Sequence, residues 1–431
     1  MPSASNKPSA SSLRLSAHIS PLAPGAQPIS KLLDGLHGIP DSRAQGQVLH
    51  PLADVLLTAL FATIADCDDF VSMGIFAQTQ LDWLRQYVPL IHGAPSHDTF
   101  RNVFMMIKPA ALLDITSAWV GSLEGLHVRI DGKVNRGVKE PESGRSRLHL
   151  LRAWVSEVGL SVGQAACDEK SNEWATLPEL LSSLELKGAL VSIDAMAGHA
   201  EAAQMIHEAG GDWILALKAN EKEVYGIVTT HFRELCGQGA ELPAGQLPKG
   251  VPVSKTLHPP DVAAREWPPG VSRSQTVEKN RGRYEERDVI VVPVGGWWPK
   301  AYLWYGVQSI ICVIRTTVRQ RQAGEHPVQE VHYYLSSLPP EAATGLGAAI
   351  RRHWDIENKC HHLLDVTYHE DHNQVRDRLC AQNLTLVREI SAKVLRDHPL
   401  KGSIRSKRKR AGLSASFRSE VIAPIFHNSH A

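Results

Sequence analysis

Two short apolar segments on either side of a helical one constrain the fold of this chain most. Residues 189–193 and 213–217 are apolar runs of strand length, and we expect the segment 200–209 between them to be a helix. A strand, a helix and a second strand in this order form a β-α-β unit, whose two strands run parallel. The sequence therefore predicts an α/β domain with a sheet that contains a parallel pair.

An aspartate directly follows the last apolar residue of two predicted strands. Asp194 follows the segment 189–193, and Asp131 ends the alternating segment 126–130, after which Gly132 predicts a turn. We expect residues 148–155 and 160–165 to form a hairpin that pairs with this strand. Both aspartates are thus expected at one edge of a mixed sheet.

Glu357 lies within a predicted, partly buried helix near the C-terminal end. Apolar residues occur there at mixed helical spacing over about residues 344–365. A single glutamate on a helix usually serves solubility, so the spacing alone does not single Glu357 out. Three carboxylates that converge at one sheet edge repel one another unless divalent cations lie between them. Two Mg²⁺ ions about 3.5–4 Å apart could support phosphodiester cleavage at such an edge.

The remaining segments have distinct patterns. We expect a flexible leader over residues 1–30 and four short helices over 31–123, with Ser96 as an N-cap and Pro109 in the first turn of the last helix. The charge of this helical part does not decide whether it holds DNA or a partner subunit. Residues 221–340 are expected to be an insertion, partly irregular and partly β, with strands at 283–292, 309–317 and 330–335.

Composition and charge narrow the class of protein. No apolar run approaches the ~20 residues of a membrane-spanning helix. The six cysteines form no CxxC pair, which argues against a disulfide framework and favours a reducing compartment. Residues 401–418 contain seven basic residues and no acid, as in a phosphate-binding arm or a solvated, disordered terminus.

Cysteine and histidine side chains are crowded around Glu357. A closed zinc site needs ligands at short repeated spacing on a fixed loop, so we expect these side chains to face DNA or to pack. We expect Trp354 to lie in the core. The residues of this cluster are His353, Cys360, His361, His362, His369 and His372.

Short motifs occur in order over about residues 32–395. They are Asp41-Ser42-Arg43, His50-Pro51-Leu52-Ala53-Asp54, Pro95-Ser96-His97-Asp98-Thr99-Phe100-Arg101, Ile130-Asp131-Gly132-Lys133, Arg136-Gly137, Lys170-Ser171-Asn172-Glu173, Ile193-Asp194-Ala195-Met196, Gly210-Gly211-Asp212, Leu217-Lys218, Gly282-Arg283, Tyr333-Tyr334-Leu335-Ser336-Ser337 and His353-Trp354-Asp355-Ile356-Glu357-Asn358. In this order and spacing they resemble the DDE transposases of bacterial insertion sequences, and among these the H-repeat-associated proteins.

The resemblance implies a fold and a domain order. The core is expected to be ribonuclease-H-like, a mixed sheet with a β-rich insertion, preceded by an all-α N-terminal domain. The expected segments are a disordered leader (1–30), a helical N-terminal domain (31–124), the first part of the core (125–220), the β-rich insertion (221–340), C-terminal helices of the core that contain the third acid (341–396) and a basic tail (397–431).

The resemblance also implies an activity. Asp131, Asp194 and Glu357 are expected to be the catalytic, metal-binding triad, with two Mg²⁺ or Mn²⁺ ions as cofactors. The protein would cut DNA at element ends and join the 3′-OH ends to target DNA, as a cytoplasmic, nucleoid-associated homodimer without a membrane segment. Two alternatives remain open, a metal-dependent nuclease without strand transfer and a decayed or domesticated DNA-binding protein.

Basic residues near these motifs and in the tail are candidate DNA contacts. The family's Tyr, Arg and Lys around the third acid are replaced by Ile350, His353 and Leu364, so Arg351 or Arg352 is expected to take the arginine's place. The candidate DNA contacts are Lys133, Arg136, Lys218, Arg283, Arg352, Lys407, Arg408, Lys409 and Arg410. Three acids close to Glu357, namely Asp365, Glu370 and Asp371, are expected to be structural or to support metal ligands.

Overall fold

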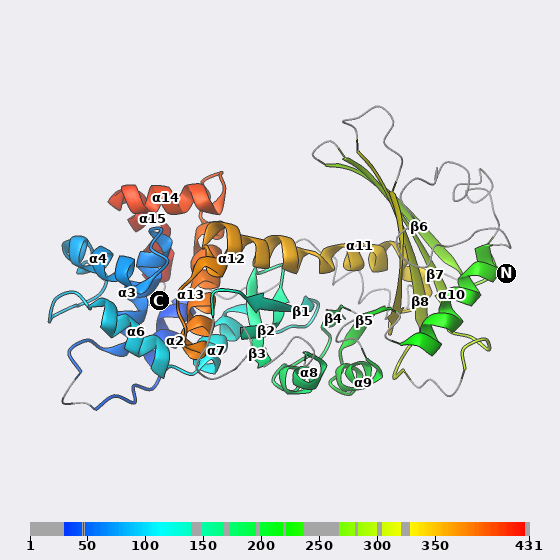
Figure 1. Ribbon diagram of the computed structural model, residues 1–431, viewed down its shortest axis with the longest axis horizontal. Helices are drawn as coiled ribbons and strands as arrows, with labels where there is room; N and C mark the ends of the chain where they lie inside the picture. The colour runs from blue at the N-terminus through cyan, green and yellow to red at the C-terminus, as the bar shows by residue number, and fades with distance from the viewer. Residues whose placement is uncertain are drawn as a thin grey trace, which may run out of the picture. The chain divides into compact units, whose positions relative to one another are not determined.

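The computed structural model describes residues 30–44, 46, 48–138, 148–167, 173–194, 199–218, 221–236, 267–280, 283–299, 304–319 and 328–426. These residues divide into two compact units (Figure 1). Unit 1 contains Leu123–Val128 and Glu185–Trp354. Unit 2 contains the described residues from 30 to Ser122, Arg129–Leu184 and the described residues from Asp355 onward.

Helices form most of unit 2. Its N-terminal segment folds into α2 (Ser30–Gly38), α3 (Leu52–Ile64), α4 (Phe70–Thr79), α5 (Leu81–Leu84), α6 (His97–Met106) and α7 (Pro109–Val120). Ser96 caps α6 by accepting a hydrogen bond from the Thr99 amide, and Pro109 begins α7, as the sequence predicts. The described part of this segment holds six helices where four are predicted, because short turns divide the apolar stripes.

The long helix α13 (Arg378–Asp397) organises this unit. It is buried from Cys380 to Leu395 and packs against α3, α6 and α7 (Figure 1). The N-terminal helices therefore share a core with a helix that lies more than two hundred residues later in the chain.

The described part of the basic C-terminal segment is helical, which contradicts the expectation of a disordered terminus but does not test phosphate binding. It forms α14 (Ile404–Leu413) and α15 (Ala415–Phe426). Arg408 explains this difference from the sequence-based expectation. Its fully buried guanidinium donates to the backbone oxygens of Thr63 and Thr367 and pairs with Asp68. The charge pattern of the segment does not indicate these partners, because they are distant in sequence.

Asp131 lies on β1, one of three neighbouring strands of unit 2. Their order is β3-β2-β1, with β1 (His127–Asn135, in unit 2 from Arg129 on), β2 (Leu148–Val155) and β3 (Leu160–Cys167). The predicted hairpin is confirmed, because β2 and β3 pair antiparallel. The helix α8 (Glu173–Ser182) packs on β2 and β3. β1 continues past the predicted turn at Gly132, so Asp131 lies inside the strand.

The helix expected over residues 344–365 is interrupted. α11 (Ala343–His353) ends at its C-cap Trp354, after which a π-helical turn, η5 (Ile356–His361), leads into α12 (His362–Thr367). A 3₁₀ turn, η6 (Glu370–His372), then precedes α13. The π-helical turn accounts for the mixed spacing of the apolar residues, which a regular helix would not produce.

Unit 1 contains the predicted β-α-β unit. β4 (Leu190–Ile193) and β5 (Asp212–Leu217) pair parallel, and α9 (Ala200–Glu208) connects them, as expected. From β4 onward the strand order is β4-β5-β9-β8-β7-β6. The pairs from β5 through β6 are antiparallel. The mixed α/β class predicted from the sequence is confirmed.

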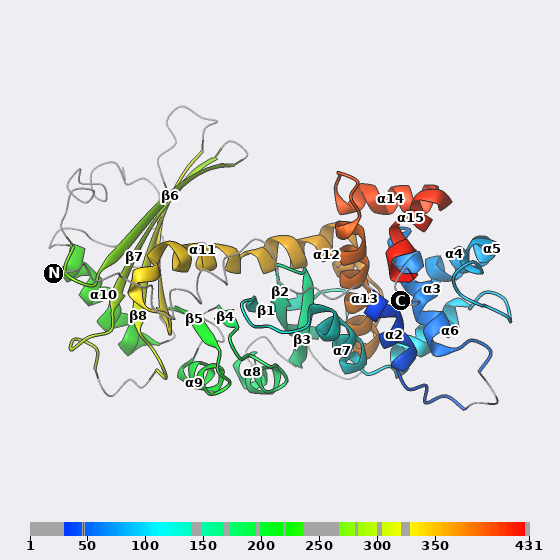
Figure 2. The ribbon, with the colours of Figure 1, turned by 180° about the vertical axis from the view of Figure 1, so that it is seen from behind.

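The insertion contributes an antiparallel sheet to unit 1. Its strands are β6 (Ser272–Asn280), β7 (Arg283–Pro293), β8 (Ser309–Arg319) and β9 (Val328–Ser336). α10 (Lys222–Cys236) lies on one face of this sheet and α11 on the other (Figures 1 and 2). The sequence predicts β7, β8 and β9 but misses β6 and α10. The segment 242–266, read as irregular, lies outside the described residues.

No single helix in the described ranges combines the length and the apolar character of a membrane-spanning segment. One bent pair, α6 with α7, meets these criteria only when both helices are taken together.

Candidate metal centre

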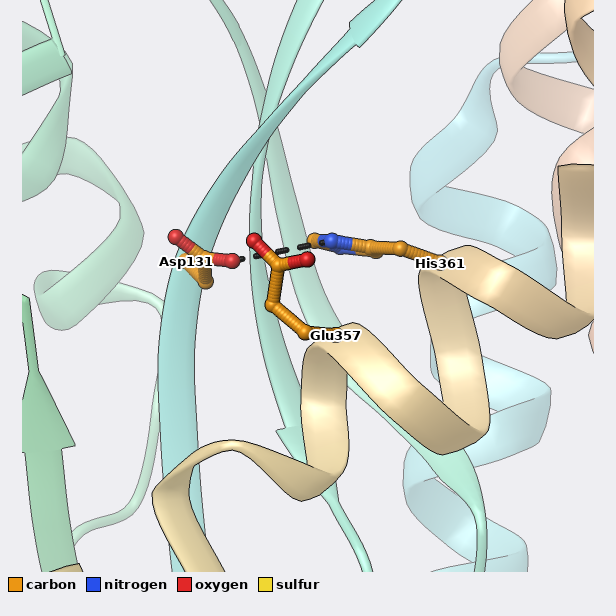
Figure 3. A group of neighbouring side chains, drawn as sticks. All are labelled: Asp131, Glu357 and His361. Carbon is orange, nitrogen blue, oxygen red and sulfur yellow. Dashed lines mark ion pairs between the residues drawn. The ribbon is translucent and has the colours of Figure 1, made fainter. Parts of the chain in front are cut away.

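Two of the three predicted acids meet in unit 2. Asp131, Glu357 and His361 each offer one ligand atom, and these atoms all lie within 4.8 Å of one another. Figure 3 shows Asp131 on a strand and the other two side chains on the neighbouring helical segment, all directed toward one point. Among the described residues, this is the one group of three such side chains that could hold a metal ion.

The strand β1 fixes Asp131. Alternate residues of a strand point to the same side, so Arg129, Asp131 and Lys133 share one face of β1. Arg129 is fully buried and pairs with Glu157 at 3.1 Å. Lys133 is also buried and binds two acids of the following helical segments. Asp131 is thus held between two anchored neighbours, and its side chain is 18% exposed.

The π-helical turn η5 positions Glu357 and His361. The His362 amide donates to the Glu357 carbonyl, five residues earlier, which is the hydrogen-bond pattern of a π-helix. Ile356 and Cys360 pack with Leu364, Trp154 and Tyr368 in a buried cluster. The next residues in the chain, Glu357 and His361, are therefore placed beside that buried face. Short π-helical turns often occur at functional sites.

His361 enters the site as a neutral ring. Burial, and then the nearby Arg152 and Lys133, lowers the pKa of His361 to about 3. Its Nδ1 lies 3.6 Å from Asp131 Oδ2, too far for a hydrogen bond. Its Nε2 is buried and has no hydrogen-bond partner among the described residues. A neutral imidazole carries one lone pair that can bind a metal.

The three side chains fit a divalent cation. Two carboxylates repel each other at this distance, and a cation between them removes that repulsion. Carboxylate oxygens suit Mg²⁺ and Mn²⁺, and a neutral imidazole adds a nitrogen donor. Asp131 and Glu357, with His361 beside them, are therefore the described residues that would hold such an ion.

A buried ionic network lies next to this centre. Lys133 Nζ binds Asp365 and the fully buried Glu370, whose carboxylate also lies 3.6 Å from Arg388 Nη1. Burial alone would raise the pKa of Glu370, but Lys133, Arg152 and Arg388 lower it to about 2. In the same unit Arg152 pairs with the buried Glu389 at 3.0 Å. Asp365 and Glu370 are thus structural acids, as expected from the sequence.

The third predicted acid lies in unit 1. Asp194 follows β4 directly, and its carboxylate accepts a hydrogen bond from Lys218 Nζ at 3.0 Å. The two side chains are 38% and 55% exposed, respectively. Asp131 and Glu357 belong to unit 2, so the membership of Asp194 in a common triad remains a prediction.

The basic candidates differ in their exposure. Lys133 and Lys407 are buried, and Arg408 is fully buried; all three bind protein groups in this structure, and their expected DNA contacts remain predictions. Arg136 is 71% exposed next to Asp371.

The other basic candidates remain predictions. Lys409 and Arg410 are exposed on α14, Arg352 is partly buried, and the side chain of Arg283 lies outside the described residues.

Sequence reasoning assigned two residues here incorrectly or incompletely. Trp354, expected in the core, is 47% exposed. His361 was expected to pack or face DNA, but it stands beside the two acids. Its position four residues after Glu357 was the available signal, because side chains four apart on a helix lie next to each other.

Two family models match this chain. The family model "Transposase DDE domain" matches residues 127–388, which include all three predicted acids. The model "DDE_Tnp_1-associated" matches residues 33–120.

Individual relatives match over most of the chain. The "H repeat-associated putative transposase YhhI" of Escherichia coli (strain K12) is 29% identical over 401 residues, which cover 92% of this chain and 98% of the relative. An "Uncharacterized protein in dhlA 3'region" of Xanthobacter autotrophicus is 34% identical over 281 residues, which cover 64% of this chain and 85% of the relative. This chain belongs to the transposase DDE domain family.

Proposed function

We propose that this protein is an active transposase that cuts DNA phosphodiesters at the ends of an insertion sequence and transfers the 3′-OH ends to target DNA. The observation that carries the proposal is the convergence of Asp131 and Glu357. They come from a strand and a π-helical turn far apart in the sequence, yet their carboxylates lie within 4.8 Å of each other. Two carboxylates at this distance repel each other, and a divalent cation bound between them would remove that repulsion.

In the proposed mechanism the chain holds and orients the reacting groups. Asp131 and Glu357 would hold a divalent ion, Mg²⁺ or Mn²⁺, and Asp194 is the third acid that the family resemblance assigns to a set for two ions. When bound, such ions activate a water or a 3′-hydroxyl and stabilise the leaving oxygen of the phosphodiester. Lys133 on β1 binds Asp365 on α12, which directly follows η5. This contact keeps the strand of Asp131 close to the helical segment of Glu357.

Binding of DNA requires a cationic surface on the protein. We propose Arg136, Arg352, Lys409 and Arg410 as backbone contacts, because phosphate binding requires accessible basic groups. Arg283 and Lys218 remain candidates from the sequence. Joining two element ends requires that both be held together, so we propose a homodimer that acts on DNA in the cytoplasm.

The proposal is tested with the full chain, a pre-cut end of the element and a supercoiled target plasmid in Mg²⁺ or Mn²⁺. We expect strand-transfer products from the wild type. Asp131→Asn and Glu357→Gln should each reduce them by at least about 100-fold. Glu341→Gln, the same change at an exposed glutamate, is the matched control and should retain activity.

Each other outcome contradicts part of the proposal. Cleavage without joined products would identify a nuclease. If Glu357→Gln retained wild-type activity, Glu357 would not be a catalytic residue. DNA binding without any cleavage in either ion would identify a DNA-binding protein that has lost its activity.

A further inference from the structure

His361 is the member of the centre that the acidic triad does not include. Its side chain is only 7% exposed, and its Nε2 has no hydrogen-bond partner within the described part of the chain. A buried polar atom without a partner costs on the order of 1–3 kcal/mol, so it needs an explanation such as a bound water or ion. The ring points from η5 toward Asp131 on β1 (Figure 3).

The direction of the ring is the second observation. The apolar contacts of this segment come from Cys360 and Leu364, which belong to the cluster with Trp154. The ring is directed toward Asp131 instead, with Nδ1 3.6 Å from Oδ2. At that distance the two atoms are not hydrogen-bonded, but both could bind one ion placed between them.

We propose that His361 is a third protein ligand of the ion held by Asp131 and Glu357, so that this position has two oxygen donors and one nitrogen donor. The inference deepens the proposed function and depends on it. A nitrogen donor changes which ion the site prefers. Mg²⁺ favours oxygen ligands alone, whereas Mn²⁺ and later divalent metals accept imidazole readily. The site should therefore bind Mn²⁺ more tightly than Mg²⁺.

The test measures ion binding directly. The full chain, freed of metal with EDTA, is titrated with Mn²⁺ and with Mg²⁺, and the bound Mn²⁺ is examined by electron spin echo envelope modulation. Imidazole nitrogen on the ion gives a ¹⁴N modulation, which we expect in the wild type. In His361→Asn this modulation should disappear and the Mn²⁺ affinity should fall by about 10- to 100-fold, while the Mg²⁺ affinity changes less.

Two further variants control for local structure. His362→Asn makes the same change at the adjacent, exposed histidine and should retain both the modulation and the affinity. His361→Asp replaces the nitrogen donor with a carboxylate. It should bind Mg²⁺ at least as tightly as the wild type and show no ¹⁴N modulation. If His361→Asn does not fold, the wild-type spectrum and His361→Asp decide the question.

The outcomes separate this inference from the proposed function. If Glu357→Gln binds Mn²⁺ as the wild type does, the proposed site itself is wrong. If Glu357→Gln abolishes Mn²⁺ binding but the wild type shows no ¹⁴N modulation, the ion site stands and His361 is not a ligand. Modulation that persists in His361→Asn also overturns the inference.

Discussion

Two groups of charged residues lie side by side in unit 2 and differ in how their charges are balanced. In the candidate metal centre, Asp131 and Glu357 face each other with a neutral imidazole, and Glu357 pairs with no cation among the described residues. In the neighbouring network, the buried Glu370 is bound by Lys133 and lies near Arg388. Asp131 and Lys133 stand only two residues apart on the same face of β1.

The balance of charge gives the two groups different roles. The network around Glu370 stabilises the fold, whereas we propose that Asp131 and Glu357 bind an ion. A buried carboxylate with cations around it keeps its charge, and removing one partner leaves the others unpaired in a medium of low polarity. Two carboxylates that face each other repel, and an ion bound between them reduces that repulsion. The comparison therefore predicts opposite effects on stability for substitutions in the two groups.

Glu370→Gln should have the largest effect on stability. It leaves Lys133 and Arg388 without their shared carboxylate, and we expect the free energy of unfolding to fall by about 3–5 kcal/mol. Urea unfolding of the full chain measures this. Asp371→Asn changes the next residue, whose partner Arg136 is exposed, and should cost less than about 1 kcal/mol. Equal effects of the two substitutions would show that the network does not stabilise unit 2.

Acid should weaken the same network. The folded pKa of Glu370 is about 2, below its ordinary value of 4.5, so its contribution is complete above pH 4.5 and is lost as the pH falls toward 2. Lys133→Met removes the cation that lowers this pKa most. The folded pKa of Glu370 should then lie closer to 4.5 or above it, so the variant should be less stable at neutral pH and lose less stability than the wild type between pH 4.5 and 2. Thermal unfolding over a pH series measures this, and an equal loss in both proteins would contradict this assignment.

The sequence predicts the parts of the fold that depend on local pattern. The β2–β3 hairpin, the parallel β4–β5 pair, the N-cap of α6 and the first-turn proline of α7 follow from period, turn residues and capping chemistry. The family motifs also single out Asp131 and Glu357, which spacing alone cannot do. These motifs lie on the strand and on the helical segment that the structure brings together around Asp131 and Glu357.

The remaining features depend on partners that are distant in sequence. Lys133 follows Asp131 closely enough to suggest a phosphate contact, but Asp365 and Glu370 bury it. Arg408 belongs to a basic run that suggests a disordered tail, yet its partners are Asp68 and two backbone oxygens of other helices. Ile356 and Cys360 of the π-helical turn pack in one buried cluster. The sequence shows this turn only as an irregular spacing of apolar residues.

Glu357→Gln should have the smallest effect on stability and is the most direct test of the comparison. In EDTA it removes one of two facing carboxylates, so unfolding free energy should stay unchanged or rise by up to about 0.5 kcal/mol. With an ion at a hundred times its dissociation constant, the wild type should gain about 2.7 kcal/mol and the variant little. Thermal unfolding of both proteins, with and without Mn²⁺, measures the two differences. A clear loss of stability in EDTA would place Glu357 among the structural acids, with Glu370, and the distinction between the two groups would fail.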